Sequence, residues 1–147
     1  MKRKRLRSHC PINFGLESFA DKWSLLIVRD IIFRGKTTYG EFLKSEEGFA
    51  TNILATRLTH LEEEGILEKR VNPDDARKNQ YWLSEKGLDL VPMLFEMILW
   101  SSKYDPKSEA RRITKLVEQI RKDNRKISHK IMERLRKGLP IFPEYLD

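Results

Sequence analysis

Residues 38–65 read TYGEFLKSEEGFATNILATRLTHLEEEG and decide the fold, because they predict two short helices joined by a tight turn. Thr38, followed three residues later by Glu41, forms a capping-box pattern in which each side chain satisfies a backbone N–H group at a helix start. A longer helix is predicted over residues 51–64, and Gly65 ends it. Its buried face consists of Leu54, Leu58 and Leu61. Two helices around a short turn are typical of a helix-turn-helix.

A mostly buried helix precedes this pair. Asp21 can cap a helix over residues 22–34, whose apolar positions follow helical spacing, and Gly35 supplies the stop. Pro11 favours the first turn of a shorter helix upstream.

A hairpin and a long helix are predicted after the pair. The strand-like runs 67–71 and 80–83 flank residues 72–79, which are dense in turn-forming residues. Ser84 can cap a helix that ends near Trp100. Pro92 is expected to bend this helix.

The C-terminal third predicts a strongly basic amphipathic helix. Asp105 and Pro106 form a cap and first-turn pair, and helical spacing of apolar residues continues to Lys137. Its apolar stripe could pair with a second chain, fold back on the helix ending at Trp100, or lie on a membrane surface. The membrane option is disfavoured because the stripe lacks Trp and Phe.

Charge and composition restrict the partners and the compartment. The formal net charge is +7, and residues 106–137 carry twelve Lys and Arg against four Asp and Glu, which favours an acidic partner such as nucleic acid. The single cysteine, Cys10, excludes an internal disulfide, and no apolar run approaches the roughly 20 residues of a membrane span. We therefore expect a cytoplasmic protein that does not associate with membranes.

The expected fold is mainly α with a small β-hairpin (α+β): a winged helix-turn-helix with long C-terminal dimerisation helices. The chain divides into a basic arm at 1–8, a DNA-binding domain at 9–104, a basic amphipathic helical extension at 105–137 and an irregular tail at 138–147. The arm either adds phosphate contacts or is a solubilising end.

Double-stranded DNA is the expected partner, and the exposed face of the helix over residues 51–64 should enter the major groove. The predicted contacts on this helix are Thr51, Asn52, Ala55, Thr56, Arg57 and Thr59. Further contacts are predicted at Arg77 and Lys78 on the hairpin tip and at Thr38 and Tyr39 on the preceding helix start. Either Asp74 or Asp75 could hold Arg77 in position. The alternative is that these residues form solvated helix and turn surfaces.

Several signatures in order resemble the HxlR family of transcriptional regulators over roughly residues 9–104. They are CPI at 10–12, KWSLLIVRD at 22–30, GIL at 65–67, YWLSEKG at 81–87 and Trp100. The resemblance implies a homodimeric regulator, often a repressor, on a pseudopalindromic operator. Three features depart from the family: Ala50 replaces a usual capping Ser, the wing at 73–77 is more like the MarR relatives, and the C-terminal helices are longer.

Cys10 has two interpretations. Some HxlR-type proteins use an N-terminal cysteine to sense oxidants or electrophiles, and nearby basic residues could favour the thiolate here. A small hydrophobe buried at a dimer interface is the preferred alternative, because free cysteine is among the most buried residue types. An oxidant or a small-molecule effector is therefore a candidate partner.

Enzymatic activity is not expected, since glycine-rich phosphate loops are absent and the three histidines lack metal-ligand or triad spacing. No cofactor or metal is predicted. Trp23 and Trp100 are expected in the core rather than in an effector pocket. The rival functions are a winged-helix protein interaction module and an RNA-binding protein without operator specificity.

Overall fold

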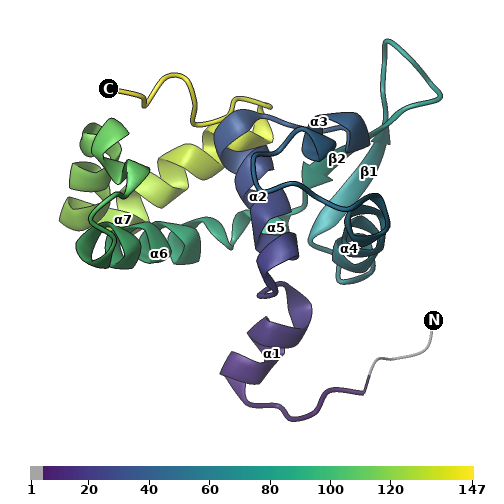
Figure 1. The fold of residues 1–147 in the computed structure, drawn as a ribbon, viewed down its shortest axis with the longest axis horizontal. Coiled ribbons are helices and arrows are strands. Elements are labelled where there is room, and N and C mark those ends of the chain that lie inside the picture. The colour runs from purple at the N-terminus through teal and green to yellow at the C-terminus, as the bar shows by residue number, and fades with distance from the viewer. Residues whose placement is uncertain (1–4) are drawn as a thin grey trace.

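Helix α2 (Lys22–Arg34) lies at the centre of the fold, and the other elements surround it (Figure 1). The structure is a computed structural model that describes residues 5–147. The Asp21 carboxylate accepts the backbone N–H of Ser24 at 3.0 Å, and Gly35 ends the helix with φ of 66°. Ile27, Val28 and Ile32 are fully buried, so α2 forms the middle of the core, as its apolar spacing predicts.

The predicted helix-turn-helix is present as α3 (Tyr39–Leu43) and α4 (Thr51–Glu63). Thr38 caps α3 by accepting the N–H of Glu41 at 3.3 Å. The Glu41 carboxylate accepts the N–H of Thr37 at 3.3 Å, one residue earlier than the usual capping box. The buried face of α4 is Leu54, Leu58 and Leu61. Helix α1 (Pro11–Ser18) projects from the body at the N-terminal side (Figure 1).

The wing is an antiparallel hairpin of β1 (Leu67–Val71) and β2 (Asn79–Leu83). Leu67 pairs with Leu83 at its base and Val71 pairs with Asn79 near its tip. The N–H of Tyr81 donates to the carbonyl of Thr37 at 2.7 Å, which attaches the hairpin to the loop before α3.

The helix predicted from Ser84 to near Trp100 is two helices, α5 (Glu85–Leu88) and α6 (Val91–Tyr104), so the prediction of one bent helix was wrong. Pro92 lies in the first turn of α6. A proline has no N–H group, and its ring clashes with the carbonyl four residues earlier, so the chain starts a new helix there.

The C-terminal extension is not the single helix that the sequence predicts. Asp105 does not cap the start of a helix; it is the C-cap of α6, and its carboxylate accepts the N–H of Lys107 at 3.0 Å within a turn. A 3-10 helix, η1 (Glu109–Arg112), follows, and then α7 (Thr114–Arg136), which kinks at Asp123. The Asp123 carboxylate accepts the N–H of Lys126 at 3.0 Å and so caps the second half of α7.

Helix α7 folds back on α6 of the same chain, which decides among the three packings considered for its stripe (Figure 1). The stripe residues Leu116, Ile120 and Ile131 are at most 2% exposed. The Asn124 side chain donates to the Pro92 carbonyl at 3.1 Å and fixes the two helices together. None of the helices within residues 5–147 combines the length and apolarity needed to cross a membrane.

The tail at 138–147 is irregular, as predicted, but it is packed against α2. The N–H of Ile141 donates to the carbonyl of Ile32 at 2.9 Å, and that of Phe142 donates to Phe33 at 2.8 Å. Ile141 is fully buried. The tail therefore completes the core beside the second half of α2.

Trp23 and Trp100, which were both predicted to lie in the core, differ in burial. Trp23 is half-buried with its ring 5.1 Å from that of Phe49, in agreement with a packing role. Trp100 is 66% exposed, so its predicted core position was wrong for the single chain.

Candidate DNA interface

Helix α4 and the wing lie side by side at one end of the molecule, and α6 and α7 lie at the other (Figure 1). The buried leucines of α4 fix its orientation, and its opposite face is open to solvent. That exposed face includes the predicted contacts Thr51, Asn52, Ala55, Thr56 and Thr59. The structure thus brings five of the six predicted α4 residues to one accessible surface.

The hydrogen bonds of α4 define what this surface can offer. The Thr56 hydroxyl donates to the carbonyl of Asn52 at 2.8 Å, and the Thr59 hydroxyl donates to that of Ala55 at 3.0 Å. Each threonine therefore presents a methyl group and an oxygen that can accept a hydrogen bond. The amide of Asn52 has no hydrogen-bond partner among residues 5–147 and keeps both its donors and its acceptor available.

Arg57 lies apart from this face. Its Nε is 3.4 Å from the carboxylate of Asp21, the residue that caps α2, and its side chain is 37% exposed. The ion pair attaches α4 to the start of α2. A phosphate contact by Arg57 stays a prediction.

Thr38 and Tyr39 have structural roles at the start of α3. Thr38 is the N-cap, and the Tyr39 hydroxyl donates to the carbonyl of Thr51 at 3.1 Å. Tyr39 therefore holds the beginning of α4 in place. Whether either residue also reaches DNA stays a prediction.

The wing tip presents Arg77 and Lys78 to solvent, and the Arg77 side chain is 91% exposed. Of the two aspartates considered, Asp75 holds Arg77: its carboxylate accepts from Nε at 3.2 Å and from the backbone N–H at 3.0 Å. These bonds from Arg77 lower the pKa of Asp75. The remaining guanidinium nitrogens have no hydrogen bond within residues 5–147 and can contact phosphate.

A buried ion cluster fixes the turn between α3 and α4, and sequence reasoning missed it. The carboxylate of Asp30, fully buried on α2, accepts from Arg29 at 2.7 Å, from Lys36 at 3.3 Å and from the Ser45 hydroxyl. Arg29 also pairs with Glu47 in the turn, which lowers the pKa of Glu47 to about 2. An acidic residue on the apolar face of a predicted helix was the signal that could have found this cluster.

Cys10 is exposed in this chain and immediately precedes α1. The backbone N–H groups of Asn13 and Ile12, at the start of α1, lower the pKa of its thiol. The shift comes from the helix start rather than from the nearby basic side chains proposed from the sequence. Residues 1–4 of the predicted basic arm lie outside the described residues, and Arg7 donates its N–H to Glu17 at 3.2 Å. No group of three or more potential metal ligands occurs in the described part of the chain.

Comparisons with known proteins agree with this geometry. The sequence model of the HxlR-like helix-turn-helix family matches residues 19–109. The HTH-type transcriptional regulator sll1512 of Synechocystis sp. is 33% identical over 88 residues, which are 60% of this chain and 64% of that protein, slightly under two thirds of its length.

Two solved structures are similar in fold. The crystal structure of PA1607 shares 38% identity with a TM-score of 0.61, over 70% of this chain and 72% of that one. The redox regulator HypR in its oxidized form shares 28% identity with a TM-score of 0.57, over 64% of this chain and 96% of that one.

Proposed function

Because the chain belongs to the HxlR-like helix-turn-helix family of DNA-binding transcriptional regulators, we propose that it binds one pseudopalindromic operator as a homodimer. The observation that carries this proposal is the unpartnered amide of Asn52 on the exposed face of α4. An asparagine amide can bond adenine through both its donor and its acceptor, and the neighbouring threonine methyl groups can contact thymine. Helix α4 lies in the major groove in this arrangement.

Backbone contacts orient the protein on the duplex. Ala50 provides no side-chain cap for α4, so the N–H groups of its first turn are available to a phosphate. Arg77 and Lys78 on the wing supply positive charge beside the groove that α4 occupies. These contacts set affinity and its salt dependence, whereas Asn52 sets sequence preference.

Exposed apolar side chains support the homodimer. Ile12 and Leu16 on α1 are 73% and 58% exposed, and Trp100 and Tyr104 on α6 are 66% and 61% exposed. Large apolar side chains gathered on a surface mark contact sites. We infer that a second copy covers them; a dimer on two half-sites needs its two α4 helices about one DNA turn, or about 34 Å, apart.

Operator binding is tested by fluorescence anisotropy with a labelled duplex from the gene's own upstream region and an excess of unrelated DNA. We expect binding that survives the competitor, with two chains per duplex. Asn52→Ala should weaken operator binding about 5- to 150-fold, because it removes a contact of about 1–3 kcal/mol. The matched control is Gln119→Ala, an exposed amide on α7, which should bind as the unaltered protein does.

Binding that unrelated DNA abolishes, or equal affinities for the two variants, would refute operator recognition and favour a protein interaction module. The dimer is tested separately by sedimentation. Trp100→Glu should shift the protein toward monomer, and Leu139→Glu, at an exposed apolar residue of the tail, should not. A monomeric unaltered protein at micromolar concentration would refute the homodimer.

Regulation by oxidation is supported by the exposed thiol of Cys10, whose pKa is lowered by the start of α1, and by the likeness to a redox regulator. Since Cys10 is the single cysteine, a disulfide must join two chains or one chain and a small thiol. The oxidant diamide, reduced to its hydrazine as the disulfide forms, should alter operator binding by the unaltered protein and leave Cys10→Ser unaffected. An identical response from Cys10→Ser would exclude this sensor.

A further inference from the structure

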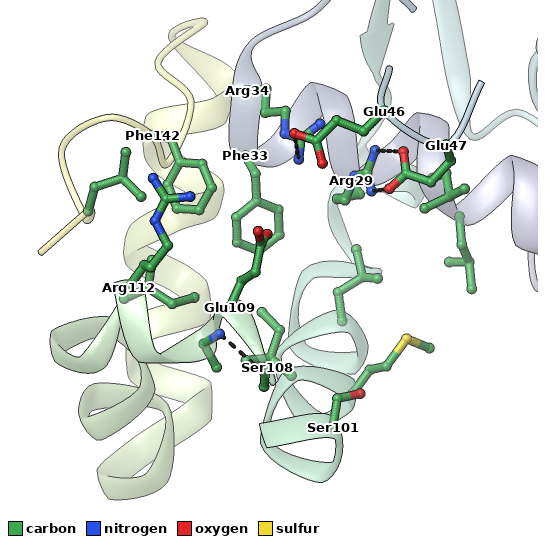
Figure 2. A pocket seen from close by; sticks show the side chains of 18 residues that line it. Arg29, Phe33, Arg34, Glu46, Glu47, Ser101, Ser108, Glu109, Arg112 and Phe142 are labelled. Atoms are coloured by element: carbon green, nitrogen blue, oxygen red, sulfur yellow. Dashed lines mark hydrogen bonds and ion pairs between the residues drawn. The ribbon is translucent and has the colours of Figure 1, made fainter. Parts of the chain in front are cut away.

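A cavity of about 360 Å³ lies between α2, α6, η1 and the tail, away from the exposed face of α4 (Figure 2). Its walls are mostly apolar and include Leu26, Phe33, Leu94, Ile98, Phe142 and Leu146. This volume lies within the range of small-molecule sites. Five lining residues follow residue 109, where the family match ends: Ala110, Arg112, Ile113, Phe142 and Leu146. The C-terminal extension of this chain therefore builds part of the cavity.

Guanidinium groups with unused donors lie at the mouth of the cavity. Figure 2 shows Arg34 above Phe33 and Arg112 beside Phe142. Within residues 5–147, the Arg112 side chain makes no ion pair or hydrogen bond. Arg34 makes only long ion pairs, 3.6 Å to Asp30 and 3.9 Å to Glu46. Planar guanidinium donors above an apolar cavity suit a carboxylate attached to an apolar body.

The acidic residues at the mouth of the cavity do not outweigh its preference for a carboxylate. Glu47 is neutralised by its two hydrogen bonds from Arg29, and Glu46 lies toward solvent with 77% of its side chain exposed. Glu109 is the remaining carboxylate at the mouth (Figure 2). A cation would meet this single carboxylate, whereas an anion meets both Arg34 and Arg112. Glu109 can accept a hydrogen bond from a hydroxyl group on such an anion.

We propose that this cavity binds a small carboxylic acid with an apolar body, which lies among the apolar walls and places its carboxylate between Arg34 and Arg112. Binding also regulates α4, and this part rests on the proposed DNA-binding function. A carboxylate paired with Arg34 competes with Glu46, which belongs to the turn that precedes α4. Occupancy therefore removes a contact between α2 and this turn and lowers operator affinity.

Binding is tested by titration calorimetry with naphthalene-2-carboxylate, and 2-naphthalenemethanol serves as the uncharged probe with the same ring. We expect one carboxylate per chain and at least tenfold weaker binding of the alcohol, since the charge-assisted bonds are lost. Ser101→Phe, which places a ring at the cavity wall on α6, should abolish binding of both probes. Thermal unfolding confirms that each variant is folded.

The arginine contact is tested with adjacent residues on η1. Arg112→Gln should weaken carboxylate binding about tenfold and leave alcohol binding unchanged. Arg111→Gln is the matched control because Arg111 is exposed and lies outside the cavity lining. Failure to bind the carboxylate, equal affinities for the two probes, or equal effects of the two arginine variants would overturn the site. A change in oligomeric state with Ser101→Phe, without carboxylate binding, would assign the cavity to a contact between copies and overturn it also.

The regulatory step has a separate readout. Naphthalene-2-carboxylate at a concentration near its Kd should lower operator affinity of the unaltered protein, and Arg112→Gln should need about tenfold more carboxylate for the same effect. Calorimetric binding without any change in operator affinity would retain the site and overturn its coupling to α4. Calorimetric binding by a protein that recognises no operator would instead refute the proposed function and leave the cavity assignment intact.

Discussion

Replacing Asp30 by asparagine should destabilise the fold more than any surface substitution of the same kind. The carboxylate of Asp30 is fully buried, and Arg29, Lys36 and Ser45 all donate hydrogen bonds to it. An asparagine of the same shape places an NH₂ group among these donors and removes the charge that balances three cations, Arg29, Arg34 and Lys36. Losing one charge-assisted bond costs about 1.5–3 kcal/mol. Because Arg29 keeps Glu47 as a partner, we expect a total loss of about 2–3 kcal/mol.

Urea unfolding followed by circular dichroism measures this loss, and thermal unfolding should show a Tm lower by about 4–12 °C for a chain of this size. Asp89→Asn, at an exposed residue of the α5–α6 junction, is the control and should stay within about 0.5 kcal/mol of the unaltered protein. If the two variants were equally stable, the Asp30 cluster would contribute no net stability, and its assigned role in holding the α3–α4 turn would be wrong.

Further predictions concern acid stability, a close backbone approach and the C-terminal helix. Arg29 lowers the pKa of Glu47 to about 2 from 4.5. The stabilisation from this pair is therefore complete above pH 4.5 and is lost as the pH falls toward 2. In urea unfolding between these pH values, Glu47→Gln should reduce the dependence of the free energy of unfolding on pH. Gly87→Ala should destabilise by about 1–3 kcal/mol in chemical denaturation, because its Cβ would lie 2.4 Å from the carbonyl oxygen of Ile66; unchanged stability would contradict this contact. Ile131→Ala should cost about 2–5 kcal/mol if α7 packs within its own chain, and a loss that depended on protein concentration would instead indicate packing between chains.

The helix-turn-helix and the hairpin were predictable because their determinants are local. Asp21 and Gly35 mark the ends of α2 within one turn of it, and three leucines four or three residues apart define the inner face of α4. Exposure of Asn52 and its threonine neighbours follows from that inner face alone. The family resemblance rested on these same segments, and the match to residues 19–109 confirms it.

The ion pairs of Asp30 and Arg57 and the packing of α7 could not be predicted, because they depend on contacts between residues far apart in the sequence. Asp30 bonds Ser45, 15 residues away, and Arg57 pairs with Asp21, so neither charge could be assigned a partner from local pattern. The α7 stripe was visible, but its spacing is equally suited to a second chain. Only the position of α6 shows that the stripe is covered by its own chain.

Helix α2 explains why changes in the C-terminal extension can affect the DNA-contacting end. Ile32 and Phe33 in its last turn accept the backbone N–H groups of the tail, and Asp30, within one turn of them, holds the turn before α4. A helix of 13 residues transmits a shift along its length because its core positions are closely packed. The tail and the turn are thus attached to the same short stretch of α2. A ligand bound between the tail and the turn can therefore affect the DNA-binding domain without deforming it. It has only to change which carboxylate Arg34 contacts.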